Sequence, residues 1–321
     1  MEQFLKTPYT QEDQYKNLIN VFNQTQLAQN SKTQYALKLS QWLIYINPTA
    51  QQSRTLHTLL YNPKQSYAAL QTTPAIKHSP QNHHIYISAA VAFINHVLKD
   101  PTLLKGWKEI ERTNSAPIAD HYDNNKPSEL QAEKLISFQD IQTIRQSLPK
   151  GSIERLLLSF YTIIEPIRAD YYATEIITSA SQTPIEENYI IFTPIQAQIV
   201  VQDFKTKNKY EKIENLLPPE LYEELKISLQ KQPRKYLFTT PENPSMPFNR
   251  KLFSNWACRT ISRTLKQPMT LTALRHLYIT NKIQSKTPTS ELKEIAKKMG
   301  HSRDMQRIYE WVGAEPLHEP R

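Results

Sequence analysis

Residues 289–309, TSELKEIAKKMGHSRDMQRIY, combine an amphipathic helix, a glycine, a histidine and a tyrosine in one short stretch. Apolar side chains recur at positions i, i+3, i+4 and i+7 of its first half: Leu292, Ile295, Ala296 and Met299. This spacing predicts a helix that buries one face, and Pro288 marks its start. Gly300 follows directly, at the position where helices commonly close with a left-handed residue. His301 is therefore expected immediately beyond the helix end, with Tyr309 eight residues further on.

Arg275 lies upstream of this stretch and completes a set of three chemically complementary side chains. A tyrosine hydroxyl can attack phosphorus, and a guanidinium can hold two non-bridging oxygens by bidentate hydrogen bonds. An imidazole can bond to the same phosphate or move a proton. No acidic residue lies within one helical turn of Arg275, which favours an external anion as its partner. Together Arg275, His301 and Tyr309 form the set that an enzyme needs to cut a phosphodiester without a metal.

Composition narrows the partners and cofactors. At 321 residues the chain is long enough for two domains, and its formal net charge of +9 favours a polyanion, above all nucleic acid. An anionic membrane is the weaker alternative, because no basic amphipathic helix stands out. Only four glycines occur, so the glycine-rich loops that bind ATP or NAD are absent. We expect no cofactor.

A single cysteine, Cys258, excludes an internal disulfide and any zinc site built from several cysteines. The adjacent His83 and His84 point apart on a helix and have no third ligand at a suitable spacing, so no metal site is predicted. The sequence shows neither a secretion signal nor an apolar run long enough to span a membrane. These features predict an intracellular protein, in the cytoplasm or a host nucleus, with no membrane association.

Patterning divides the chain into two predicted domains. Residues 9–103 read as helices, one capped by Ser31 and another opened by Pro80. A polar, turn-rich run predicts a linker over about 113–132. The boundaries that follow are an all-α domain over 1–125 and a second domain over 133–321.

The second domain is predicted to mix helices with a small sheet. Ser137 can cap a helix, and 156–164 form a strongly apolar one. Residues 189–203, rich in Ile, Val, Phe and Thr, read as strands. Helical patterning resumes at Pro219 and continues in two further segments, 250–265 and 271–281. The predicted fold class is mostly α with a small β-sheet: an all-α N-terminal domain followed by an α+β domain.

Three short segments carry a family resemblance: Leu274-Arg275-His276, Met299-Gly300-His301-Ser302 and Ile308-Tyr309. They resemble the C-terminal motifs of tyrosine recombinases, the phage-integrase-like enzymes that exchange DNA strands. In that family such an arginine, histidine and tyrosine belong to one active site. The resemblance implies a tyrosine-recombinase catalytic domain here, preceded by a helical core-binding domain that contacts DNA.

Upstream, the segment EPIRADY at 165–171 looks like the family's box for its first catalytic arginine, and Arg168 is the match. The family also has a β-hairpin with a catalytic lysine near its turn. Here several lysines follow residues 199–204, and the resemblance of Phe204-Lys205-Thr206 to viral and transposon-borne members favours Lys205. Lys207 is the alternative.

Several further expectations follow from the resemblance. The remaining lysines of this hairpin, Lys207 and Lys209, are expected to contact DNA. The amino-acid sequences of the arginine box and of the hairpin are similar to those in integrases from large DNA viruses, virophages and related mobile elements. Two positions depart from the family pattern. Thr272 stands where the family often has a histidine, and the spacing from His301 to Tyr309 is one residue shorter than in many bacterial members.

The resemblance implies a site-specific recombinase or integrase that cuts and rejoins double-stranded DNA through a covalent 3′-phosphotyrosyl intermediate. It also implies a homo-oligomer, a tetramer on paired sites, in which Trp311 and Val312 could plug a neighbouring protomer. Two alternatives stay open: a type IB topoisomerase-like enzyme, and a catalytically inactive DNA-binding protein of the same fold. His276 is interpreted as structural rather than catalytic.

Overall fold

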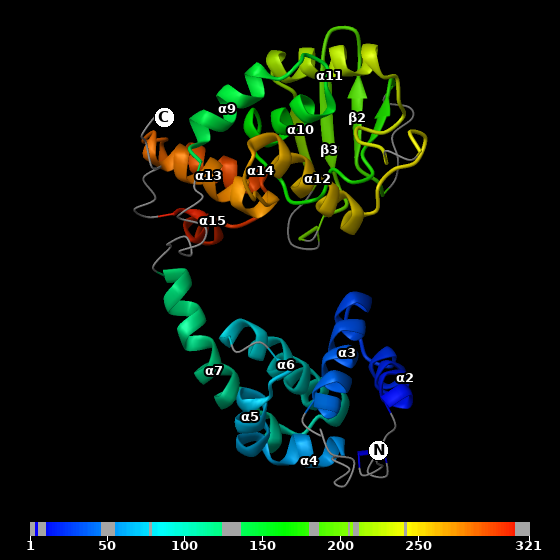
Figure 1. Ribbon diagram of the computed structural model, residues 1–321, viewed down its shortest axis with the longest axis vertical. Helices are drawn as coiled ribbons and strands as arrows, with labels where there is room; N and C mark the ends of the chain where they lie inside the picture. Colours follow the sequence, from blue (N-terminus) through cyan, green and yellow to red (C-terminus); the bar gives the residue numbers. More distant parts are fainter. Residues whose placement is uncertain are drawn as a thin grey trace. The chain divides into compact units, whose positions relative to one another are not determined.

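The computed structural model describes most of the chain: residues 4–5, 11–45, 55–76, 79–123, 136–179, 186–204, 206–207, 212–240 and 243–311. By its internal contacts the chain divides into two compact units, Met1–Asp123 and Asn124–Arg321 (Figure 1). The predicted fold class is confirmed, because the described part of the first unit is all helical and the second combines helices with a small sheet.

The first unit packs its helices around buried aromatic side chains. Its elements are α2 (Gln11–Asn23), α3 (Gln29–Tyr45), α4 (Leu56–Tyr61), α5 (Pro63–Thr72), α6 (Pro80–Phe93), the π-helical turn η1 (Ile94–Leu98) and α7 (Pro101–Asp123). Trp42 and Trp107 are fully buried and meet edge to face, with ring centroids 5.6 Å apart. The indole N–H of Trp107 donates to the carbonyl of Leu60 over 2.8 Å. A single apolar core of the described residues therefore holds this unit together.

Two expectations for the first unit need correction. Ser31 does not cap α3, because its own backbone N–H already bonds to the carbonyl of Ala28 and the helix begins at Gln29. The linker expected over 113–132 is helical as far as Asp123. The buried amide of Asn114 explains this continuation, since it donates to the carbonyl of Pro80 over 2.9 Å and so fixes α7 against α6. Positions 124–132 lie outside the described residues.

Among the described residues of the second unit, every helix except α15 lies where the sequence predicts one. The helices are α9 (Phe138–Ser147), α10 (Ile153–Thr162), α11 (Pro219–Lys231), α12 (Arg250–Leu265), α13 (Leu271–Gln284), α14 (Thr289–Lys298) and α15 (Arg303–Tyr309). Ser137 caps α9 as predicted, with its hydroxyl accepting from the backbone N–H of Asp140. Helix α10 is central: its residues 155–162 are all buried, and it contacts α9, α11, α12 and α13.

The sheet of the second unit has four strands in the order β1-β2-β3-β4. Strands β2 (Tyr189–Phe192) and β3 (Ala197–Val201) lie in the region 189–203 that the sequence predicts as strands, and they pair antiparallel with Ile190 opposite Ile199. The flanking strands are β1 (Glu175–Ile177), parallel to β2, and β4 (Ile213–Leu216), antiparallel to β3. Strand β1 has only three residues, too short for a periodic signal, and the sequence did not predict it. Figure 1 shows β2 and β3 on the opposite side of this unit from α13 and α15.

The turn after α14 depends on Gly300. Its φ of +67° lies in the left-handed region, and the N–H of His301 bonds to the carbonyl of Ala296 over 3.1 Å. This is the helix ending that the sequence predicts. A Cβ at position 300 would lie 3.3 Å from the ring of Phe204, at the base of the β3–β4 hairpin. Gly300 therefore lets the histidine turn and the hairpin approach closely.

We expect Gly300→Ala to destabilise the second unit by about 1–2 kcal/mol, since a side chain with positive φ is strained and Phe204 leaves little room. The matched control is Gly106→Ala in α7, where a Cβ would make only an ordinary contact with Pro63 at 3.6 Å. Chemical denaturation of both variants measures the difference. Equal stability of Gly300→Ala and the unsubstituted protein would contradict the assigned backbone geometry.

Candidate active site

Arg275 is the centre of the site. It lies in the first half of α13, is fully buried, and its guanidinium donates to the backbone carbonyl of Pro166 and, over 3.5 Å, to that of Met299. The same Nη2 lies 3.3 Å from Nδ1 of His301, and Nε has no partner. No carboxylate of the described residues forms an ion pair with it. Burial lowers its pKa, but an arginine stays charged in a protein, so this cation has no carboxylate ion-pair partner in the part of the chain that the structure describes.

His301 follows Gly300 and is almost completely buried. A guanidinium N–H can only donate, so Nδ1 of His301 accepts from Arg275 and the proton of the neutral ring is on Nε2. Burial first, and then the charges of Arg275 and Arg168, lower the pKa of His301 to about 3. The ring is therefore neutral near pH 7. Its Nε2 is buried and has no hydrogen-bond partner among the described residues, so it presents an unused hydrogen-bond donor.

Tyr309, the last residue of α15, places its ring against this pair. The guanidinium carbon of Arg275 lies 5.0 Å from the centre of the phenol ring, and the centroids of the His301 and Tyr309 rings are 5.3 Å apart. Burial raises the pKa of the phenol, but the charges of Arg275 and Arg168 and hydrogen bonds from the same two side chains outweigh it, so the pKa is lowered. The site therefore favours the nucleophilic phenolate form more than water does.

Arg168 lies in the loop after α10, where the hydroxyl of Tyr161 holds its backbone carbonyl at 2.7 Å. Its side chain reaches the phenol of Tyr309 from this loop. The two carboxylates next to it in sequence have other partners. Asp170 pairs with Arg250, and Glu165 with Lys298. Among the described residues neither carboxylate forms an ion pair with Arg168, although its charge acts on Asp170 as well as on Tyr309.

The structure thus brings together Arg168, Arg275, His301 and Tyr309, which come from a loop, a helix, a helix-terminal turn and a short final helix. Their catalytic roles stay predictions. Of the predicted hairpin residues, Lys205 and Lys209 lie outside the described residues.

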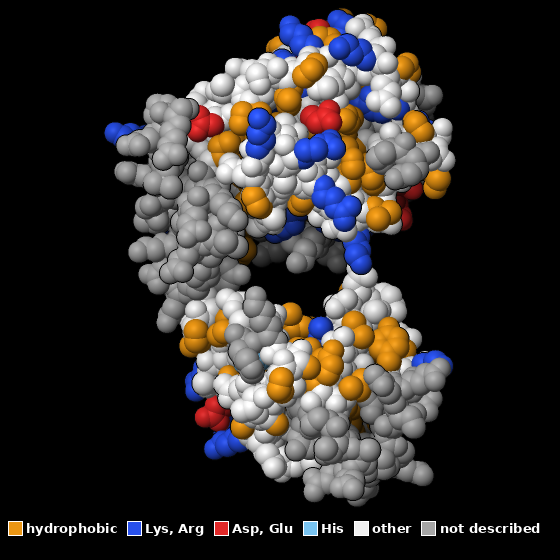
Figure 2. Space-filling model, viewed as in Figure 1, with side chains coloured by type: hydrophobic (Ala, Val, Ile, Leu, Met, Phe, Trp, Pro, Cys, Tyr) orange, Lys and Arg blue, Asp and Glu red, His pale blue; other side chains and the backbone are white. Residues whose placement is uncertain are grey.

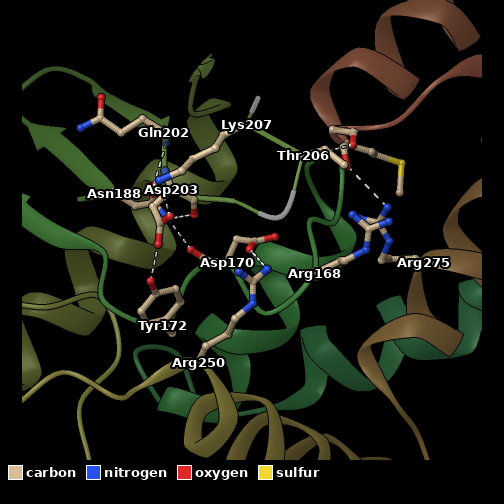
Figure 3. Close-up of polar contacts among 12 residues, drawn as sticks. Arg168, Asp170, Tyr172, Asn188, Gln202, Asp203, Thr206, Lys207, Arg250 and Arg275 are labelled. Carbon is tan, nitrogen blue, oxygen red and sulfur yellow. Dashed lines mark hydrogen bonds and ion pairs between the residues drawn. The ribbon is translucent and has the colours of Figure 1, made fainter. Parts of the chain in front are cut away.

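Lys207 is described, and its ammonium lies 3.0 Å from a carboxylate oxygen of Asp203. Figure 3 shows this side chain directed toward Asp203, away from Arg168 and Arg275. Its side chain is half exposed, with 50% of its surface accessible. The choice between Lys205 and Lys207 as the catalytic lysine therefore stays open, and in this arrangement Lys207 is not in contact with the arginine pair.

A polar network that the sequence did not predict fixes the base of this hairpin (Figure 3). The amide of Asn188 accepts from the backbone N–H of Asp203 over 2.7 Å and donates to the carbonyl of Asp170 over 2.7 Å. The hydroxyl of Tyr172 donates to the carboxylate of Asp203. On the other side, Thr206 donates to the carbonyl of Gly300 over 2.8 Å. The network ties the hairpin to both the Arg168 loop and the His301 turn.

The structure also shows where Thr272 and Trp311 lie, two residues that the family resemblance singles out. Thr272, at the position where the family often has a histidine, is exposed on α13. Trp311 is buried within its own second unit, 6% exposed. The reason is a stack of its indole on the imidazole of His276, at 4.7 Å between centroids. Val312 lies outside the described residues.

Comparisons with known proteins give little support of their own. No protein-family model matches the chain, and no curated protein does. Among solved structures, one titled "Crystal structure of XerA recombinase" aligns over 95% of both chains, with 12% sequence identity and a TM-score of 0.39. Among the described residues, no helix is long and apolar enough to cross a membrane, and no cluster of side chains suits a metal ion.

Proposed function

We propose that the chain is a DNA strand-breaking and rejoining enzyme of the tyrosine type, a site-specific recombinase or integrase. The observation that carries the proposal is the contact of one phenol, Tyr309, with two arginines that have no carboxylate partner among the described residues. Beside them stands a neutral imidazole with an unused N–H, on His301. This arrangement suits a pentavalent phosphate that carries extra negative charge.

In the proposed reaction Tyr309 loses its phenolic proton to water and its oxygen attacks a backbone phosphorus. The bond from phosphorus to the 5′ oxygen breaks, and a 3′-phosphotyrosyl link forms. Arg168 and Arg275 stabilise the charge that develops on the non-bridging oxygens. His301 donates its Nε2 proton in a hydrogen bond to one of them, since Nδ1 is engaged by Arg275. The departing 5′ oxygen takes a proton from Lys205, or from Lys207 after its release from Asp203. Attack by a second strand's 5′ hydroxyl reverses these steps, so no energy source is needed.

The chain's charge supports a DNA partner. Its net charge of +9 provides the phosphate neutralisation that drives association with a duplex. On the face drawn in Figure 2, Lys and Arg side chains are more widespread over the second unit than Asp and Glu. We assign DNA contact to both proposed domains, 1–125 and 133–321, with Lys207 and Lys209 at the hairpin. Recombination also requires several protomers on paired sites, so a tetramer on DNA is part of the proposal.

The test is whether a covalent adduct forms on a nicked suicide duplex. After cleavage the short product strand diffuses away, so religation is prevented and the covalent intermediate accumulates. We expect the unsubstituted protein to form a protein–DNA band that survives denaturing electrophoresis, and Tyr309→Phe to form none. The matched control is Tyr278→Phe, another buried tyrosine of the same core, which should retain the adduct. Failure of the unsubstituted protein to form an adduct would leave the inactive DNA-binding protein as the better proposal.

Plasmid relaxation and duplex joining separate the recombinase from the second alternative. A type IB topoisomerase-like enzyme would form the adduct but would relax a supercoiled plasmid that lacks any recombination site, and it would not join two sites. A recombinase is expected to join two labelled duplexes. Neither outcome depends on the choice of catalytic lysine.

A further inference from the structure

Two hydrogen bonds and a ring stack tie the end of α15 to α13. Nδ1 of His276 lies 2.8 Å from the carbonyl oxygen of Tyr309, and the backbone N–H of Trp311 donates to Oγ1 of Thr280 over 2.9 Å. The rings of His276 and Trp311 stack with their planes 8° apart. His276 and Thr280 are four residues apart and so share one face of α13. We call the side chains of His276, Thr280 and Trp311 the C-terminal latch.

The His276 hydrogen bond has a fixed direction. A carbonyl only accepts, so Nδ1 carries the proton and donates it to Tyr309. Burial is the main reason why the pKa of His276 falls to about 4; the charge of Arg275 lowers it further, and the bond to the Tyr309 backbone partly offsets both. The ring is therefore neutral near pH 7, and its single N–H is used by the backbone of Tyr309. The charged or titratable groups that face it are Arg275 and Tyr309.

The hydrogen bond from His276 connects Tyr309 directly to the residue that follows Arg275 in α13. Tyr309 ends α15, so its carbonyl is one of those left without a partner inside the helix. The side chain that satisfies this carbonyl belongs to the residue next to Arg275 in the chain. The position of the phenol over the guanidinium is therefore set by one hydrogen bond from the same turn of α13.

We propose that His276 is a positioning residue, which with the rest of the C-terminal latch holds the hydroxyl of Tyr309 at Arg168 and Arg275 of its own chain. The inference rests on the proposed function and names a role within that same site. A displacement of a reacting group by about 1 Å can cost roughly a hundredfold in rate. A side chain that merely fills the core would instead change stability without a selective effect on cleavage.

Two substitutions separate the parts of the His276 contact. His276→Asn keeps an N–H donor close to the position of Nδ1, whereas His276→Phe keeps a ring to stack on Trp311 and loses the donor. Thr280→Val removes the acceptor for the N–H of Trp311, and Thr280→Ser restores it. The control is Ile279→Val, a fully buried position of α13 outside the latch.

The first readout is the single-turnover cleavage rate on the suicide duplex, measured with DNA affinity and melting temperature. We expect His276→Phe to slow cleavage by roughly 30- to 100-fold and His276→Asn by less than about fivefold, with affinity within about twofold in both. Thr280→Val should slow cleavage and Thr280→Ser should recover it, while Ile279→Val cleaves normally. Normal cleavage by His276→Phe, or equal losses in His276→Phe and His276→Asn, would overturn the role.

The second readout does not need activity, so it separates failure of this inference from failure of the proposed function. The phenol's pKa is lowered only while the ring stays beside its two arginines. The pKa is measured by spectrophotometric titration, with the titration curve of Tyr309→Phe subtracted. His276→Phe should raise this pKa, and His276→Asn should leave it nearly unchanged. An unmoved pKa in His276→Phe would reject the latch, whether or not the protein cleaves DNA.

Discussion

Replacement of Arg275 is expected to reduce the rate of strand cleavage by roughly 10³-fold or more. Arg275→Ala removes the only described cation that is both fully buried and in hydrogen-bond contact with His301 and Tyr309. Arg275→Lys keeps a charge, but a lysine ammonium cannot form the planar fork that holds two phosphate oxygens. We therefore expect the lysine variant to recover little of the lost rate. Single-turnover cleavage of the suicide duplex measures both.

The loss must be separated from a loss of structure, because the same guanidinium donates to the backbone carbonyls of Pro166 and Met299. Arg275→Lys can replace one of these bonds and serves as the less disruptive variant. Removal of the charge also has a signature that needs no DNA. Arg275 lowers the pKa of the Tyr309 hydroxyl, so this pKa should rise in Arg275→Ala. The rise is expected together with the loss of cleavage.

DNA affinity provides the control for Arg275. A buried side chain that acts on the transition state should change cleavage far more than binding, so the dissociation constant is expected to stay within about tenfold. Cleavage by Arg275→Ala within about tenfold of the unsubstituted rate would contradict its place in the site. A folded Arg275→Lys with normal cleavage would contradict the requirement for the fork.

The local parts of the site were predictable because each has a short-range cause. The apolar spacing of 289–299 and the glycine after it predict where α14 ends, and the structure places His301 there. The lack of acidic neighbours around Arg275 predicts a cation without an ion pair, and the described residues contain none for it. Patterning therefore predicts individual helices and the side chains at their ends.

Long-range pairing was not predictable. The sequence leaves Asp170 and Glu165 as competing partners of Arg168, and no local signal reveals that they pair instead with Arg250 and Lys298, 80 and 133 residues away. The expected linker is another case: a polar run reads as a turn-rich loop, although the side chain of Asn114 finds its partners only once α5, α6 and α7 are packed. Such contacts depend on tertiary neighbours rather than on the order of residues.

The buried ion pair of Arg155 and Glu224 is another long-range contact that the sequence did not predict. Its disruption has the largest expected effect on stability. Arg155 in α10 donates three hydrogen bonds to the carboxylate of Glu224 in α11, over 2.6 to 2.9 Å. Its remaining Nη1 bonds to the carbonyls of Gln146 and Leu148 at the end of α9. This arginine therefore uses its whole guanidinium inside the protein, whereas the Nε of Arg275 has no hydrogen-bond partner among the described residues. Both are buried arginines, and only the contacts distinguish a structural one from a candidate for an external anion.

Glu224→Gln should destabilise the second unit by about 3–5 kcal/mol, because it leaves the charge of Arg155 buried without its counter-ion. The control lies on the same helix: Glu223 forms an exposed pair with Lys226 at 3.2 Å, and Glu223→Gln should cost less than about 1 kcal/mol. The double variant Arg155→Met with Glu224→Leu should recover part of the loss, but not all, since the carbonyls of α9 lose their donor. Chemical denaturation measures all three, and cleavage by Glu224→Gln at low temperature should stay normal because Arg155 does not contact the phenol site. Equal costs for Glu224→Gln and Glu223→Gln would show that the pair is not buried in solution.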